Sequence, residues 1–348
     1  MKRITAILAS LLLAASSLCA QELTNFSFWG QKPVVSPEIQ NDSVTFRLKA
    51  DYATVVKLSG SWMPNPWGGT IDMTRGENNV WEVTIPLPEP EIYTYNFVAD
   101  GVSVNDPQNV MVQRDGSRYL SMLLVDGERT ENYKSADKRG TVSHPWYDSQ
   151  ILGINRRLTV YTPYGYETNP KAKYPVLYLL HGAGGDEEAW SSMGRTAQIL
   201  DNLIAQGKAK PMLVVMTNGN AWQTAAVGEA AGGMNQPSMR MSGNQARPAA
   251  SFEQSFGDVI KFVESNYRVI KQKSARAIAG LSMGGGHSYN ISRTYPNTFD
   301  YVGLFSAAAG NLEDEAVQNT LKAQRDNGFK LYWIACGAAD FLYQRNLD

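Results

Sequence analysis

Apolar and polar side chains alternate with a period of two along short runs in the first third of the chain. Residues 43–49, 81–85 and 93–97 show this alternation, which is typical of strands that bury one face. Glycine and proline separate the runs, and no helical period occurs among them. Residues 21–125 are therefore predicted to form a small all-β sandwich.

The pattern changes after residue 140, where strand-like runs alternate with helical segments. Several of these runs are apolar on both faces, as buried parallel strands are. The clearest helix covers residues 251–267, whose apolar side chains form one stripe. This alternation predicts a doubly wound α/β sheet over residues 141–348. The predicted strands are residues 157–162, 174–180, 211–216, 275–279, 301–306 and 330–336.

The segment between the two patterns, residues 126–140, is charged and poor in apolar side chains. Such composition is typical of an interdomain linker. We therefore place the domain boundary there.

The N-terminus has the features of a secretory signal. A short basic start precedes an apolar run over residues 4–18, and Ala20 stands before a polar residue. The run is too short for a membrane span. Residues 1–20 are predicted to be a signal peptide, and the mature protein to be secreted or periplasmic. Cys19 makes a lipoprotein anchor the alternative, but the bulky Leu18 before it favours plain cleavage.

Composition excludes several classes of partner. The 32 basic and 33 acidic residues give a formal charge of −1, so we expect no affinity for nucleic acid or for anionic membranes. Outside the predicted signal only Cys336 remains, which leaves no internal disulfide. The three histidines are scattered without metal-ligand spacing, so we expect no metal and no cofactor. No sequence feature indicates an oligomeric state.

The motif Gly-Leu-Ser-Met-Gly over residues 280–284 carries the candidate chemistry. A predicted strand leads into it and a helix-compatible segment leads out. Its glycines permit a sharp strand-to-helix turn that exposes Ser282 at the carboxyl end of the sheet. Ser282 is the predicted nucleophile of a sheet of α/β-hydrolase type. An ordinary glycine-rich turn is the alternative.

A second glycine-rich motif, His181-Gly182-Ala183-Gly184-Gly185, follows a predicted buried strand. Acyl transfer requires fixed N–H groups for a developing oxyanion. We expect the amide of Met283 to supply one donor, and Ala183 or else Gly184 to supply the other. His181 could serve as a base, but a role in bracing the turn is the favoured interpretation.

The predicted acid is Asp340, which follows the last predicted strand; a solvated loop aspartate is the alternative. In α/β-hydrolases the histidine follows the acid, and no histidine follows Asp340 in this sequence. His287 is predicted to be a packed helix residue. We therefore expect a fragment that lacks the C-terminal end of its esterase domain and has low activity by itself.

Several motifs in one order carry a family resemblance. They are Tyr147-Asp148-Ser149, the Leu-Thr-Val-Tyr-Thr-Pro run over residues 158–163, the two glycine motifs, and Ala335-Cys336-Gly337 before Asp340. From Tyr147 to its end the chain resembles the esterase D group, which includes the feruloyl and acetylxylan esterases of carbohydrate esterase family 1. The resemblance implies Ser282 as nucleophile, Asp340 as acid and the Met283 and Ala183 region as oxyanion hole. It also implies a histidine in a later Gly-Gly-His-like loop.

The N-terminal half is similar to early-set, glycogen-binding-like modules, and Asn105-Asp106-Pro107 lies in the stretch that carries this likeness. Trp62 and Trp67 are candidates for stacking on a sugar ring, with packing against the esterase domain as the equal alternative.

Trp190 and Trp222 are candidate substrate contacts in the second domain. Trp222 lies in a long loop over residues 219–250, where Met234, Met239 and Met241 could line an acyl pocket. Disorder or surface packing of this loop is the alternative.

Together these features predict an esterase that removes feruloyl groups from arabinoxylan-type plant cell-wall polysaccharide or its oligosaccharides. Acetyl groups on xylan are the next choice of substrate, and the expected partners then include acetylated oligosaccharides. A siderophore esterase of enterochelin type is disfavoured because no basic cluster is evident. The alternative from another class of protein is a non-catalytic carbohydrate-binding protein whose esterase half is an inactive relic.

Overall fold

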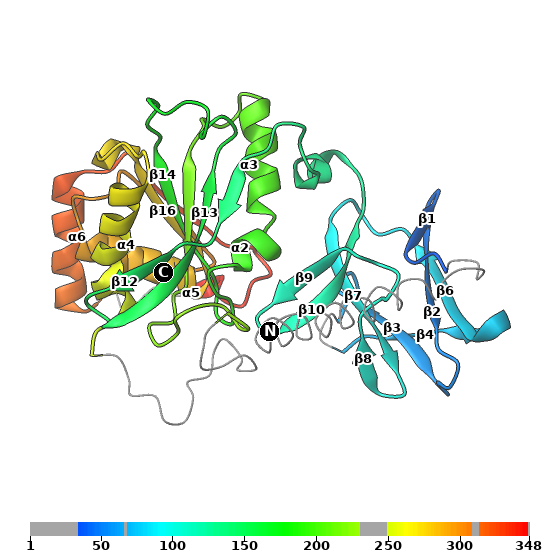
Figure 1. Ribbon diagram of the computed structural model, residues 1–348. Coiled ribbons are helices and arrows are strands. Elements are labelled where there is room, and N and C mark those ends of the chain that lie inside the picture. Colours follow the sequence, from blue (N-terminus) through cyan, green and yellow to red (C-terminus); the bar gives the residue numbers. More distant parts are fainter. Residues whose placement is uncertain (1–33, 66–67, 230–248, 308–312, 347–348) are drawn as a thin grey trace, which may run out of the picture. The chain divides into compact units, whose positions relative to one another are not determined.

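The computed structural model describes residues 34–65, 68–229, 249–307 and 313–346. The predicted signal peptide, Trp67 and the three methionines of the long loop lie outside the described residues. The chain divides into two compact units (Figure 1). Met1–Leu87 and Asn96–Val110 form the first unit, and Pro88–Tyr95 and Met111–Asp348 form the second.

The first unit contains the β-sandwich strands that the alternating pattern predicts. One antiparallel sheet has the order β1-β2-β6-β5. In β2, every second side chain is buried, including Val44, Phe46 and Leu48, so the predicted period of two is confirmed. The strands of the unit are β1 (Glu38–Gln40), β2 (Ser43–Lys49), β3 (Val56–Gly60), β4 (Ile71–Asp72), β5 (Thr74–Arg75), β6 (Val80–Pro86) and β8 (Val102–Val104), with a short 3-10 helix η1 (Glu77–Asn79).

Strand β7 (Ile92–Ala99) is shared between the units. Its second half pairs with β8. Its first half, in the second unit, pairs with β10 (Arg118–Leu124), which pairs in turn with β9 (Val112–Asp115). These pairings make β9 and β10 part of the sheet of order β4-β3-β7-β10-β9, and the two strands belong to the second compact unit.

The predicted linker contains ordered structure in the second unit. Its 3-10 helix η2 (Glu128–Tyr133) and the residue after it accept hydrogen bonds from a side chain of α3. Asn202 Nδ2 donates to the carbonyl oxygens of Asn132 and Lys134 at 3.2 and 2.8 Å. The domain boundary at residues 126–140 stays a prediction.

The second unit is built on a mixed sheet with the order β11-β13-β15-β14-β16-β17-β18. The strands from β15 to β18 are parallel, whereas β13 is antiparallel to β15. The strands are β11 (Thr141–Ser143), β12 (Trp146–Ser149), β13 (Ile154–Thr162), β14 (Val176–Leu180), β15 (Leu213–Thr217), β16 (Arg276–Leu281), β17 (Tyr301–Phe305) and β18 (Leu331–Ala335). The helices are α2 (Ala189–Ser192), α3 (Thr196–Ala205), α4 (Phe252–Asn266), α5 (Met283–Thr294) and α6 (Glu315–Asn327), with short 3-10 helices η3 (Lys273–Ala275) and η4 (Gln344–Asn346).

Helices cover both faces of this sheet (Figure 1). The strands β13, β14 and β15 bury both faces, whereas β18 at the edge is largely exposed. Tyr178 and Leu180 of β14 pack in the core shared with α4 and α5, while Leu179 packs in the core shared with α3. Helix α4 begins with a capping box between Ser251 and Gln254. The predicted doubly wound sheet and the predicted helix over residues 251–267 are confirmed.

Candidate active site

Ser282 stands between β16 and α5 with a backbone φ of 53° and ψ of −113°. A non-glycine residue with positive φ is strained by about 1–3 kcal/mol and persists only where its surroundings fix it. Here the Ser282 N–H donates to Phe305 O at 2.8 Å, and Gly286 N–H donates to Ser282 O at 3.0 Å. The structure thus places Ser282 at a tight strand-to-helix turn, as the motif predicts.

The glycines around Ser282 are required by close packing of backbone on backbone. A Cβ added at Gly280 would lie 2.3 Å from Gly284 C and O, and one at Gly284 would lie 2.3 Å from Leu180 O. At Gly285 it would lie 2.7 Å from the Ala307 Cβ. No side chain fits at these separations, so the turn depends on glycine at each position.

The second glycine motif lies beside the serine. A Cβ on Gly182 would be 3.5 Å from the Ser282 Cβ. Gly185 N–H donates to Gly182 O at 3.1 Å, which closes a turn containing Ala183 and Gly184. Ala183 is exposed, and Gly184 has a φ of 88°. Met283 begins α5, where the first N–H groups have no partner within the helix. The structure therefore brings the predicted oxyanion segments to the nucleophile, while their role stays a prediction.

His181 is buried and uses both ring nitrogens. Gly219 N–H donates to His181 Nε2 at 2.8 Å, so the proton sits on Nδ1, which lies 2.7 Å from Gly182 O. Burial lowers the pKa of His181 to about 4. A neutral imidazole with both nitrogens engaged braces the loop, in agreement with the favoured interpretation of this residue.

His287 packs inside the unit, as predicted for a helix residue. Its Nδ1 lies 2.7 Å from Glu253 Oε1, and its ring meets the Phe252 ring edge-on with centroids 5.1 Å apart. Burial raises the pKa of Glu253, but the hydrogen bond and the charge interaction with His287, together with hydrogen bonds to Ser251 and to backbone, outweigh burial. The pKa of Glu253 therefore falls to about 2. The third histidine, His144, places Nδ1 3.0 Å from Thr159 Oγ1. Within the described ranges, no histidine hydrogen bonds with Ser282.

Asp340 follows β18 at the edge of the sheet where β16 delivers Ser282, because β16, β17 and β18 run parallel. Its Oδ1 accepts the Leu342 N–H at 2.8 Å, which fixes the carboxylate in the loop. Topology thus places the predicted acid at the same edge as the nucleophile. Its catalytic role stays a prediction.

The candidate aromatic contacts fall in different surroundings. Trp190 packs against the core cluster shared with α3. Trp222 follows β15 and is partly buried, and its indole N–H has no hydrogen-bond partner among the described residues. In the first unit, Trp62 stacks on Phe46 with centroids 5.5 Å apart and planes at 17°. Trp62 also lines a pocket of about 500 Å³ together with Met63, Pro64, Asn65, Gly69, Thr70, Ile71, Ile85 and Pro86.

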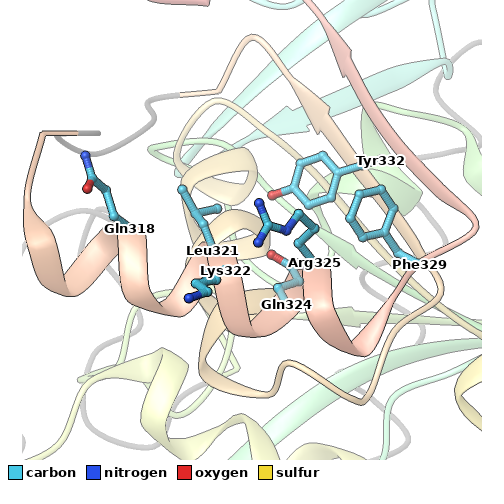
Figure 2. A pocket seen from close by; sticks show the side chains of 7 residues that line it. All are labelled: Gln318, Leu321, Lys322, Gln324, Arg325, Phe329 and Tyr332. Carbon is cyan, nitrogen blue, oxygen red and sulfur yellow. The ribbon is translucent and has the colours of Figure 1, made fainter.

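Another pocket, of about 540 Å³, lies between α6 and the start of β18. Figure 2 shows Arg325, Phe329 and Tyr332 grouped at one end of it. It contains none of the predicted site residues. Within the described part of the chain, no cluster of His, Cys, Asp and Glu side chains could hold a metal ion. No described helix has the length and apolar character needed to cross a membrane.

Sequence reasoning missed an ionic cluster behind the second glycine motif. Asp186, Glu187 and Glu188 pair there with Arg114 and Arg157. Three consecutive acids after a glycine-rich turn are visible in the sequence. Their partners come from distant strands, and no local pattern identifies them.

A mixed sheet covered by helices on both faces, with a serine at a tight strand-to-helix turn, defines a domain of α/β-hydrolase type. The same fold occurs in the enterobactin esterase of Shigella flexneri, solved in the presence of enterobactin. That structure is 15% identical and covers 92% of this chain and 95% of its own, with a TM-score of 0.58.

The family follows from sequence comparison. The putative esterase model matches residues 149–336, more than half of the chain. The chain belongs to this family. A second model, carbohydrate-binding module 48 (isoamylase N-terminal domain), matches residues 33–113. The resemblance to an esterase preceded by a glycogen-binding-like module is thereby confirmed.

Two relatives carry xylanase names. An endo-1,4-beta-xylanase/feruloyl esterase of Xylanibacter ruminicola is 30% identical over 279 residues, which is 78% of this chain and 35% of the relative. Endo-1,4-beta-xylanase Y of Acetivibrio thermocellus is 31% identical over 173 residues, 46% of this chain and 14% of the relative. The chain thus spans about a third or less of the length of these relatives.

Proposed function

We propose that this chain is a serine esterase that cleaves acyl esters through an acyl-enzyme on Ser282. The observation that carries the proposal is the positive φ of Ser282 at the turn from β16 to α5, beside Gly182. A strained turn of this kind exposes a hydroxyl at the carboxyl end of the sheet.

In the proposed reaction, Ser282 Oγ attacks the ester carbonyl carbon and loses its proton to a general base. The carbonyl oxygen becomes an oxyanion, which accepts hydrogen bonds from the amides of Met283 and of Ala183 or Gly184. The tetrahedral intermediate collapses, the alcohol leaves with a proton, and Ser282 retains the acyl group. Water then loses a proton to the base and attacks the acyl carbon, the bond from that carbon to Ser282 Oγ breaks, and the acid is released as Oγ regains its proton.

The base is a histidine oriented by Asp340 in this proposal. His181 cannot fill this role in the described geometry, because both of its nitrogens are engaged and its pKa is about 4. Within the described residues no histidine hydrogen bonds with Ser282, so we expect slow turnover. A site without a triad member retains roughly 10³–10⁴-fold acceleration over water from the oxyanion hole and binding.

The proposed substrate class is feruloyl esters of arabinoxylan-type polysaccharide, with acetyl esters second. Support comes from the name of the Xylanibacter ruminicola relative and from the carbohydrate-binding module match. The predicted signal peptide supports action outside the cytoplasm, in the periplasm or after secretion. The likeness to enterobactin esterase concerns the fold, so siderophore esters rank below plant cell-wall esters.

The test labels the chain with a p-nitrophenyl phosphonate in the presence of free imidazole, which stands in for the base that no described histidine supplies. The reagent phosphonylates a serine beside an oxyanion hole irreversibly and requires no turnover. Peptide mass spectrometry is expected to find the label on Ser282, and Ser282→Ala is expected to remove it. Ser117→Ala, at an exposed turn, is the matched control and should label like the parent chain. Label elsewhere, or none on Ser282, would refute the proposal.

Substrate class is measured with methyl ferulate and a simple acetyl ester. We expect Ser282-dependent hydrolysis to favour the ferulate. A strong preference for the acetyl ester would exclude the feruloyl choice. Fast turnover lost in Ser282→Ala would mean that a histidine of this chain serves as base.

A further inference from the structure

Three consecutive acids follow the turn that presents the predicted oxyanion donors Ala183 and Gly184. The Asp186 and Glu187 side chains are 1% and 0% exposed. A buried carboxylate is costly unless it is paired and hydrogen bonded. The basic side chains that pair with these acids therefore determine where the acids lie.

Arg114, on β9, holds the first of the three. Its two terminal nitrogens donate to Asp186 Oδ2 and Oδ1, both at 2.7 Å, and one of them also lies 3.0 Å from Glu188 Oε2. Burial of Arg114 opposes its charge, but these carboxylates outweigh burial and raise its pKa. A bidentate guanidinium–carboxylate pair fixes both distance and orientation.

Arg157, on β13, holds the second acid. Its Nε donates to Glu187 Oε1 at 2.7 Å, and it also pairs with Glu188. Glu187 Oε1 further accepts the Ala226 N–H at 2.8 Å. Glu188 is thus shared by two arginines that come from different parts of the second unit.

The hairpin that carries Arg114 makes further contacts next to the turn. Gln113 Nε2 donates to Met193 O at 3.2 Å, and Ser192 Oγ donates to Arg114 O at 3.2 Å. Within the turn segment, Asp186 Oδ1 also accepts the Glu188 N–H at 3.0 Å. The carboxylate that pairs with Arg114 stands two residues beyond Gly184 and accepts a backbone N–H four residues beyond it.

We propose that Arg114 is a positioning residue for the turn over residues 182–185, which presents the predicted oxyanion donors Ala183 and Gly184. Arg114 acts on this turn through Asp186. It lies outside the segment matched by the esterase model and one residue beyond the carbohydrate-binding match. In this proposal Arg114, which neither family model covers, determines the position of the amides in the turn. The inference rests on the function proposed for Ser282.

The test follows backbone hydrogen exchange by mass spectrometry in the full chain, in peptides covering residues 181–190 and, as reference, the core strand β15. Four variants are compared. Arg114→Met removes the pair, and Arg114→Lys keeps the charge without the bidentate geometry. Arg114→Met with Asp186→Asn removes both charges, which relieves an unpaired buried carboxylate. Arg118→Met is the matched control, on the same hairpin with an exposed side chain.

We expect exchange in residues 181–190 to rise at least tenfold in Arg114→Met, while β15 is unchanged. Arg114→Lys should restore part of the protection, and Arg118→Met should match the parent chain. The double variant should recover thermal stability without recovering protection of the turn. Equal loss in β15, unchanged exchange in the turn, or full protection in the double variant would each overturn the proposal.

This readout does not depend on catalysis. Absence of phosphonate label on Ser282 would remove the proposed function, and the exchange pattern would still decide whether Arg114 fixes the turn.

Discussion

The imidazole of His181 accepts the backbone N–H of Gly219 at 2.8 Å. His181 directly follows β14 and Gly219 follows β15, so one neutral ring joins the loops that leave two adjacent parallel strands. A protonated ring has no lone pair to accept this bond. The state of one buried side chain therefore determines whether the two loops stay connected.

Stability is expected to depend on pH through His181. Its folded pKa of about 4 lies below its ordinary value of 6.5, so folding favours the neutral ring. The contribution is complete above pH 6.5 and is lost as pH falls toward 4, for a total of about 3 kcal/mol. Urea unfolding between pH 4 and 7 measures it, and His181→Asn should have a shallower slope. Identical slopes would contradict the prediction.

Gly284→Ala is expected to destabilise the second unit, because its Cβ would lie 2.3 Å from Leu180 O. Overpacking costs about 1–3 kcal/mol, and more where the contact is with rigid backbone. Thermal unfolding followed by circular dichroism measures the loss. Gly337→Ala is the control, since the nearest contact of its Cβ would be 3.9 Å away. Equal melting temperatures for both variants would show that the turn tolerates a side chain.

Ala183→Pro tests the oxyanion donor, because proline removes the N–H at that position. Loss of one donor lowers the rate by about 10²–10³-fold. The second-order rate of Ser282 phosphonylation measures the effect. Ala183→Gly keeps the N–H and should retain the parent rate. A normal rate in Ala183→Pro would assign the donor to Gly184.

Trp62→Ala tests sugar binding by the pocket of the first unit. Aromatic stacking contributes about 0.5–1.5 kcal/mol, so affinity for soluble arabinoxylan should fall about threefold to tenfold. Affinity electrophoresis measures retardation by the polysaccharide. Trp146→Ala, on an exposed position of the second unit, is the control. Unchanged retardation in Trp62→Ala would leave its stacking on Phe46 as its role.

The site was predictable to the extent that its parts are local in the sequence. Gly280, Ser282 and Gly284 lie within five residues, so their spacing alone indicates the turn that the structure contains. The Arg114–Asp186 pair joins residues 72 apart, and no periodicity connects them.

In the fold, too, features that depend on neighbouring residues were predictable and features that depend on distant segments were not. Burial alternates along β2 as its sequence does, whereas β13 resembles its parallel neighbours in composition but runs antiparallel to β15. Strand direction depends on the connections between elements, and side-chain pattern does not record it. The packing of Trp190 in the core beside α3 was likewise invisible in the sequence, because an aromatic residue after a loop suits a substrate pocket or a core equally well.

Because β9 and β10 belong to the same compact unit as the α/β sheet, they affect where this unit can be joined to other domains by recombination. Multidomain enzymes diversify by recombination, and a cassette survives transfer when it carries every residue that its own interior needs. In this chain, a transferable segment must start before Arg114, upstream of the charged residues 126–140 that composition indicates as the linker. A chimaera joined at residue 141 would leave Asp186 without its bidentate guanidinium, even though every residue of the esterase match was retained.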